Sequence, residues 1–198
     1  ITVVHGARPG PTITLLGAVH GNELVGPLAL TYLSGPNFIG SGKPIDPDVL
    51  SGTIRIVPIV NMPGYKMKSR YMPDGRDLNR SFPGKPDSNT SYRVANRFWK
   101  EIIAGSDYVI DLHTAAVGRT NMPQIRANLA HASSNKIARS FGIEAILDNV
   151  GPKGSLRRVT NDADIACVTF EGGGPDELDP ESVQVSLYGI LNLSLIHI

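Results

Sequence analysis

His20 and Glu23 have the residue types and the placement of metal ligands. They stand in the segment His20-Gly21-Asn22-Glu23, which follows an apolar run that predicts a strand and opens a predicted helix. Histidine and glutamate both bind zinc, and a catalytic zinc site uses three protein ligands and one open position. Taken alone, the segment also fits a surface histidine beside a glutamate that suits a helix N-terminus.

His113 is the third candidate ligand. It ends the apolar segment Ile110-Asp111-Leu112-His113, which predicts another strand. In open α/β sheets, ligands bind at the carboxyl ends of strands, so His20 and His113 are expected to converge on one edge of the sheet. Asp111 could orient a ligating histidine through its second ring nitrogen, or the alternation of the strand could direct its side chain elsewhere. The alternative is a histidine that is simply hydrogen-bonded at the end of a strand.

Glu171 is a candidate general base. It ends the apolar run 165–170, and Gly172, Gly173 and Gly174 follow it. These glycines would let a substrate or the backbone approach closely. A glutamate beside a zinc-bound water is the group that general-base hydrolysis needs. The alternative is a solvated glutamate where a strand meets a loop.

A basic loop over residues 69–84 could bind an anionic substrate. It carries three arginines and an asparagine, and it does not have the pattern of an amphipathic helix. An arginine can hold a carboxylate through two parallel hydrogen bonds, and it can neutralise the oxyanion of a tetrahedral intermediate. The alternative is a solvated basic loop. The four side chains are those of Arg70, Arg76, Asn79 and Arg80.

Short apolar runs alternate with helical patterns along the chain. This alternation predicts an α/β fold with a mostly parallel mixed sheet and helices on both faces. The long segment 61–89, rich in proline and glycine, predicts a functional loop, and 148–164 predicts a flap or surface loop. Strands are expected over 12–19, 53–60, 107–112, 123–129, 143–147 and 165–170, and helices over 24–33, 90–104 and 133–141.

Length and composition predict one domain with a substantial core. No apolar stretch approaches the roughly 18 residues of a membrane helix. The net charge is +1, from 19 basic and 18 acidic residues, which gives no case for nucleic acid or a membrane surface as a partner. The one cysteine, Cys167, is expected to be an inert core thiol. No signal peptide is visible, and we expect a cytoplasmic protein.

Four segments, in this order, resemble the succinylglutamate desuccinylase/aspartoacylase family, a branch of the zinc carboxypeptidase-like fold. They are GAVHGNE at 17–23, SRY with DLNRSFPG at 69–71 and 77–84, VIDLHT at 109–114, and TFEGGG at 169–174. Each motif is moderately specific, and the ordered set is much more so. The resemblance implies one zinc ion per chain, bound by His20, Glu23 and His113.

The resemblance also implies roles for the remaining candidates. Glu171 would activate water and then pass the proton to the leaving amine. Arg70 would polarise the scissile carbonyl, with Arg76 as a rival for that role, and Asn79 and Arg80 would anchor a substrate carboxylate.

The function expected from this resemblance is zinc-dependent hydrolysis of a linear amide, other than a peptide bond, in a small N-acyl amino acid. A metallocarboxypeptidase acting on peptides and a non-catalytic carboxylate-binding module are the alternatives. The catalytic domain is expected over 1–192, and 193–198 are expected to be a foreign tail. Full-length members of the family usually continue into a small β-rich domain, and we expect this sequence to be a fragment without it. The sequence does not indicate an oligomeric state.

Overall fold

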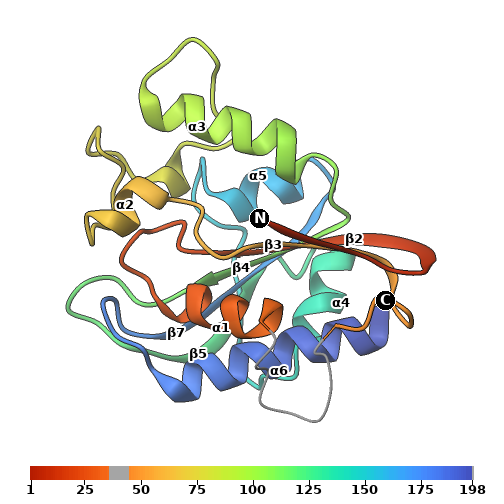
Figure 1. The fold of residues 1–198 in the computed structure, drawn as a ribbon. Coiled ribbons are helices and arrows are strands. Elements are labelled where there is room, and N and C mark those ends of the chain that lie inside the picture. The colour runs from red at the N-terminus through yellow and green to blue at the C-terminus, as the bar shows by residue number, and fades with distance from the viewer. Residues whose placement is uncertain (36–44, 198) are drawn as a thin grey trace.

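A mixed β-sheet lies between two layers of helices (Figure 1). The computed structural model describes residues 1–35 and 45–197, with side chains described as far as residue 193. Within these residues the strand order is β1-β3-β2-β4-β7-β5-β6. Only the pairs β1–β3 and β5–β7 are antiparallel, which confirms the predicted mostly parallel sheet. The strands are β1 Thr2–His5, β2 Arg8–Gly17, β3 Ser51–Val57, β4 Tyr108–His113, β5 Asn121–Ala127, β6 Ile146–Asp148 and β7 Ala166–Gly173.

Helices cover both faces of the sheet, as predicted. One face of the sheet is covered by three helices, α1 Val25–Ser34, α4 Ala132–Ser140 and α6 Pro180–His197. The opposite face is covered by α3 Thr90–Phe98, its π-helical continuation Trp99–Ile103, and α5 Leu156–Asp162. Two short elements lie in the long loop after β3, namely α2 Met62–Lys66 and the 3-10 helix η1 Leu78–Arg80.

The period-two alternation of the central strands decides which side chains reach the site. In β4, Ile110 and Leu112 pack toward α1 and α6, whereas Val109 belongs to the core under α3 and α5. Asp111 and His113 share the parity of Val109, so they face the α3/α5 side. The same reasoning places Glu171 of β7 on that side, two residues beyond Thr169. The site is therefore at the carboxyl ends of the central strands, on one face of the sheet.

The buried thiol of Cys167 lies in the core under α3 and α5. Burial raises the pKa of this thiol to about 12, which keeps it protonated near neutral pH. The core position predicted for this cysteine is confirmed.

The prediction of a loop over 148–164 is wrong for its second half, which forms α5. Ser155 caps this helix, and its Oγ accepts a hydrogen bond from the backbone N–H of Arg158 at 3.3 Å. Leu156 is fully buried in the core and Arg157 is buried beside it. Because Arg157 and Arg158 follow Leu156 directly, the sequence here lacks the apolar periodicity that would predict a helix.

The sequence did not predict β1 or α6. The backbone of α6 extends to His197, and its apolar residues pack on α1, α4 and the sheet. Residue 198 and the side chains of 194–197 lie outside the described residues, so the foreign tail expected over 193–198 stays a prediction.

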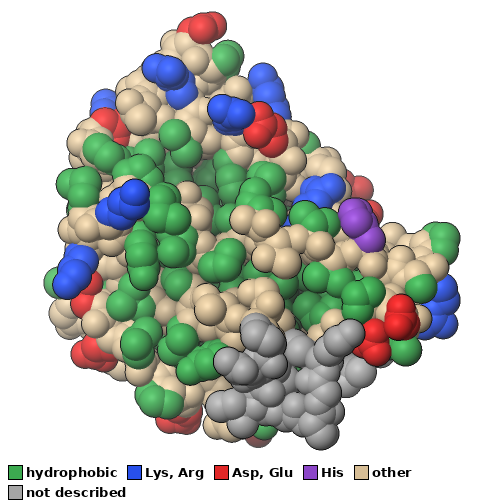
Figure 2. Space-filling view, viewed as in Figure 1, with side chains coloured by type: hydrophobic (Ala, Val, Ile, Leu, Met, Phe, Trp, Pro, Cys, Tyr) green, Lys and Arg blue, Asp and Glu red, His purple; other side chains and the backbone are tan. Residues whose placement is uncertain are grey.

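Hydrophobic side chains cover much of the face shown in Figure 2. Exposed large apolar residues include Met62 and Tyr65 of α2, and Met67 and Tyr71 in the loop that follows. None of the helices in the described ranges has the length and the apolar character needed to cross a bilayer.

Candidate metal and catalytic site

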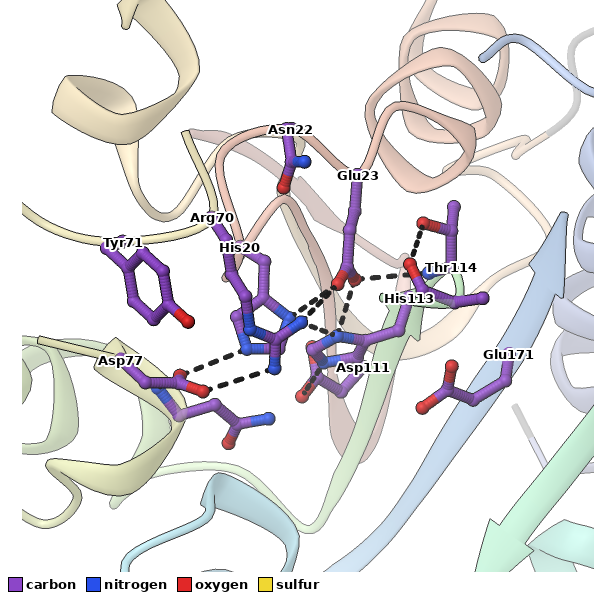
Figure 3. Close-up of polar contacts among 12 residues, drawn as sticks. His20, Asn22, Glu23, Arg70, Tyr71, Asp77, Asp111, His113, Thr114 and Glu171 are labelled. Atoms are coloured by element: carbon purple, nitrogen blue, oxygen red, sulfur yellow. Dashed lines mark hydrogen bonds and ion pairs between the residues drawn. The ribbon is translucent and has the colours of Figure 1, made fainter. Parts of the chain in front are cut away.

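The three predicted metal ligands, His20, Glu23 and His113, meet at one point (Figure 3). Their candidate ligand atoms all lie within 4.8 Å of one another, and all three residues are buried. Nδ1 of His20 lies 2.7 Å from Oε1 of Glu23, and Nδ1 of His113 lies 2.8 Å from Oε2. The two Nδ1 atoms are 3.1 Å apart. Histidines 93 positions apart in the sequence thus present their donor nitrogens to the same carboxylate.

The sheet brings the two histidines together. β2 and β4 are neighbouring parallel strands, with Gly17 in register with Leu112. His113 is the last residue of β4, and His20 follows shortly after β2 ends. The carboxyl ends of adjacent parallel strands therefore converge, as the sequence predicted.

The second nitrogen of each histidine contacts a carboxylate. Nε2 of His20 lies 3.0 Å from Oδ1 of Asp77, and Nε2 of His113 lies 2.8 Å from Oδ2 of Asp111. With zinc bound, a carboxylate in this position would hold the proton on Nε2 and leave the Nδ1 lone pair to the metal. Two imidazole nitrogens and one carboxylate are the ligand set of known catalytic zinc sites. The residues present therefore fit a zinc ion.

The charges around the site also favour a cation. Burial opposes the ionisation of Glu23, but the charges of His20 and His113 and their hydrogen bonds lower its pKa to about 2. Burial lowers the pKa of His113, yet Asp111 and Glu23 raise it well above its usual value. The pKa of Asp77 lies well below its usual value despite burial, because of its hydrogen bond to His20 and the positive charges nearby. Three carboxylates thus surround the two histidines, and a divalent cation would balance them.

Arg70 lies at this centre and Arg76 does not. The guanidinium of Arg70 donates to Oε1 of Glu23 and to Oδ2 of Asp77, each at 3.1 Å. Arg76 is exposed, and its guanidinium donates to the backbone carbonyl of Asp74 at 3.5 Å and lies 4.0 Å from the Asp74 carboxylate. Of the two arginines left open by the sequence, Arg70 is the one in reach of a substrate at the metal site.

Glu171 lies in the same cavity as the metal ligands. It is in register with His113 on the neighbouring parallel strand, and its carboxylate is turned toward the two histidines in Figure 3. The cavity has a volume of about 270 Å³ and is lined by His20, Glu23, His113 and Glu171. Burial raises the pKa of Glu171, although His113 and Arg126 favour its ionised form. A raised pKa makes this carboxylate a stronger base.

Asn79 and Arg80 lie at the rim of the site, on η1. Asn79 Oδ1 accepts a hydrogen bond from the backbone N–H of Leu156 at 2.8 Å, which ties η1 to the start of α5. Arg80 is exposed, donates to the carbonyl of Asn79 at 2.6 Å, and also lines the cavity. No carboxylate within the described residues forms an ion pair with Arg80, so its guanidinium can meet a substrate carboxylate.

Further polar residues that the sequence analysis did not select also belong to the site, and they include Asp77 and three residues of β5 and the loop before it. Asp77 lies inside the DLNRSFPG motif, but nothing in that motif indicates that Asp77 contacts His20. The others come from β5 and the loop before it, whose side chains reach the cavity because β5 runs antiparallel beside β7. No motif in the sequence reveals that pairing. These three are Arg119, Asn121 and Arg126.

Comparisons with known proteins find similarity over most of this chain. The model of the succinylglutamate desuccinylase/aspartoacylase catalytic domain matches residues 9–197. The N-alpha-acetyl-L-2,4-diaminobutyric acid deacetylase of Halomonas elongata is 38% identical over 121 residues, which are 61% of this chain and 32% of that protein.

Two solved structures share the fold. The product-bound ectoine utilization protein EutE (DoeB) from Ruegeria pomeroyi superposes with a TM-score of 0.84 at 26% identity, over 96% of this chain and 58% of that one. A succinylglutamate desuccinylase/aspartoacylase from Rhodobacter sphaeroides gives 0.81 at 30% identity, over 96% and 56%. The zinc carboxypeptidase-like fold is thereby confirmed. The chain spans little more than half the length of these structures and about a third of the curated relative.

Proposed function

Because the chain belongs to the succinylglutamate desuccinylase/aspartoacylase catalytic-domain family, we propose that it is the catalytic domain of a zinc-dependent deacylase. Its reaction is hydrolysis of a linear amide, other than a peptide bond, in a small N-acyl amino acid. One observation carries this proposal: His20, Glu23 and His113 meet at one point, with Glu171 in the same cavity. The relative from Halomonas elongata, named as a deacetylase of an N-acetylated amino acid, supports the substrate class.

His20, Glu23 and His113 would hold one zinc ion per chain. Bound there, zinc would lower the pKa of water and polarise a carbonyl oxygen. Asp77 and Asp111 keep the histidine Nδ1 atoms directed at the site, because each contacts the opposite ring nitrogen.

Glu171 accepts a proton from water as the water oxygen attacks the amide carbon. It then gives that proton to the amine nitrogen as the carbon–nitrogen bond breaks. The guanidinium of Arg70 stabilises the negative charge that develops on the carbonyl oxygen. Arg70 is already oriented by its bonds to Glu23 and Asp77, so little reorganisation is needed during the reaction.

Asn79 and Arg80 bind the carboxylate of the substrate. The carboxylate would approach from the rim of the cavity, where Arg80 is exposed and without an ion-pair partner among the described residues. An arginine fork gives such an anion both charge and orientation. This remote contact would place the amide bond beside Glu171 and raise kcat as well as affinity. We assign these roles to residues 1–192 as the catalytic domain.

The test measures zinc content and hydrolysis together. Purified protein should contain about one zinc per chain and should release amine from members of an N-acyl amino acid panel. His113→Ala should lose both zinc and activity. His5→Ala is the matched control, because His5 is on β1, outside the candidate site, and its ring hydrogen-bonds the Thr53 hydroxyl, and it should keep both.

Three results would contradict the proposal, and two of them would favour one of the alternative functions. Folded wild type that takes up no zinc would remove the basis for the reaction. Bound zinc with no hydrolysis across the panel would favour a carboxylate-binding module. Release of C-terminal amino acids from peptides in preference to N-acyl amino acids would favour a carboxypeptidase.

A further inference from the structure

Both oxygens of the Glu171 carboxylate are held by side chains of β5. Oε2 accepts a hydrogen bond from Nδ2 of Asn121 at 2.9 Å. Oε1 lies 3.1 Å from a terminal guanidinium nitrogen of Arg126. The candidate base is therefore fixed from a strand that carries none of the residues predicted for the site.

An irregularity in β5 makes this double contact possible. Gln124 is in register with Glu171 and Arg126 with Thr169, whereas Asn121 is in register with Gly173. The register shifts by one residue between Asn121 and Gln124. With strict alternation, Asn121 and Gln124 would point to opposite faces of the sheet, because they are three positions apart. The extra residue turns Asn121 to the same face as Gln124, so it meets Glu171 from the side opposite Arg126.

The two contacts leave Glu171 able to take a proton. Each carboxylate oxygen has two acceptor positions, and each uses one of them here. The remaining lone pairs are available toward the cavity. Glu171 is buried and a buried carboxylate resists ionisation, so a fixed guanidinium beside it favours its charged form.

We propose that Arg126 and Asn121 are positioning residues that hold the Glu171 carboxylate in place for proton transfer. The inference rests on the proposed deacylase reaction, because it takes Glu171 as the base. Arg126 also lines the cavity, so the rival is an arginine that binds the substrate carboxylate directly. The two roles predict different kinetics.

Steady-state kinetics of Arg126→Gln separate the roles. A positioning role predicts a fall in kcat of about 10- to 100-fold, less than the whole ~10²–10⁴-fold contribution of a general base, with KM nearly unchanged and zinc content normal. Arg126→Lys should restore part of kcat, because the ammonium keeps the charge but not the fork. Asn121→Ala should lower kcat in the same way, by a smaller factor. Arg97→Gln removes an exposed Arg–Glu pair on α3 and is the matched control.

A double-mutant cycle tests whether Arg126 acts through Glu171. Residues that act as a unit give strongly non-additive losses. The double variant Arg126→Gln with Glu171→Gln should therefore be no slower than Glu171→Gln alone. Additive losses, or an Arg126→Gln effect confined to KM, would overturn the proposal in favour of direct substrate binding.

Crystal structures of zinc-loaded wild type and Arg126→Gln give a readout that needs no activity. The Glu171 carboxylate should leave its wild-type position in the variant, while the β5–β7 ladder stays intact. An unmoved carboxylate would overturn the inference, whatever substrate the enzyme takes. A wild type without hydrolase activity would refute the proposed function, and the crystal structures would still decide whether Arg126 positions Glu171.

Discussion

At the scale of single residues, each histidine of the site uses its two ring nitrogens differently. Nδ1 faces Glu23, while Nε2 of His20 contacts Asp77 and Nε2 of His113 contacts Asp111. In the proposed zinc site, this second contact would select the tautomer of each histidine, so an aspartate outside the ligand set would orient each ligand. Glu171, the proposed base, is not part of this group, because its carboxylate contacts Asn121 and Arg126 of β5 instead.

Replacement of Glu171 by glutamine should remove turnover and leave the metal site intact. Glutamine is nearly isosteric but cannot accept the proton from water. We expect kcat to fall by roughly 10²–10⁴-fold, with zinc content equal to wild type because Glu171 is not a ligand. Near-normal kcat in a zinc-loaded Glu171→Gln protein, measured on the best substrate of the panel, would show that another group is the base.

At the scale of elements, the site depends on loops pressed against each other at the ends of the strands. The loop from β2 to α1 carries His20 and Glu23, and it packs on the backbone of α2 at Gly64. The loop from α2 to α3 carries Arg70 and Asp77, and it is anchored at α3 through Asp74. Each loop contains little helix or strand. Its conformation therefore depends on close contacts and on single hydrogen bonds.

Gly21→Ala should disrupt the metal site without touching a ligand. A Cβ on Gly21 would lie 2.1 Å from the carbonyl carbon of Gly64, which is backbone and cannot move aside alone. The loop that carries His20 and Glu23 must then shift, and we expect weaker zinc binding in a titration. Gly105→Ala is the control, since its Cβ would meet only the Arg55 guanidinium at 3.6 Å. Equal zinc affinity in wild type and Gly21→Ala would refute this account of the loop.

Asp74→Asn should reduce stability in a pH-dependent way. One carboxylate oxygen of Asp74 accepts from the backbone N–H of Ser91 at 3.0 Å, and the other accepts from the Ser91 hydroxyl. Burial opposes ionisation of Asp74, but these bonds lower its pKa from 3.8. At neutral pH we expect a loss of about 1 kcal/mol in the free energy of unfolding, measured by urea denaturation.

The sign of this pH dependence follows from the direction of the shift. The pKa of Asp74 is lower in the folded state, so the wild-type advantage is complete above the unfolded value near 3.8. It should shrink as the pH falls through the folded value. The exposed Asp87, replaced by asparagine, is the control and should leave the free energy of unfolding nearly unchanged. A wild-type advantage that grows on acidification would contradict the role given to Asp74.

At the scale of the whole molecule, the candidate metal site lies between the central strands of the sheet and the long loop after β3. β2 and β4 lie in the middle of the strand order, and each is packed by helices on both faces. Glu23 connects both histidines to Arg70, which reaches Asp77 in the loop. A ligand at this point therefore contacts segments that are far apart in the chain, and its binding energy should add to global stability.

Zinc should raise the melting temperature of the protein. A ligand that binds only the folded state at about 100 times its Kd adds ~2.7 kcal/mol to the free energy of unfolding. For a domain of this size that corresponds to about 5–10 °C, measured by calorimetry with zinc and with a chelator. His113→Ala should show no such difference. Equal melting temperatures of the wild type in zinc and in chelator would count against a zinc site.

The sequence by itself determined the fold class and the three residues that meet at the candidate metal site. Strand periodicity placed His20 and His113 at carboxyl ends, and the parallel sheet then required them to converge. The sequence left the direction of the Asp111 side chain open, and the structure places it 2.8 Å from Nε2 of His113, on the same side of β4.

Only the tertiary structure decided the contacts that depend on pairing between distant segments. It separated Arg70 from Arg76, since the path of an irregular loop follows from its packing and not from its composition. It made Asp77 the partner of His20, and it turned Asn121 and Arg126 onto Glu171 through a shifted antiparallel register. Neither the strand neighbours of β7 nor that shift is encoded in a local pattern, because both arise from the packing of the whole sheet.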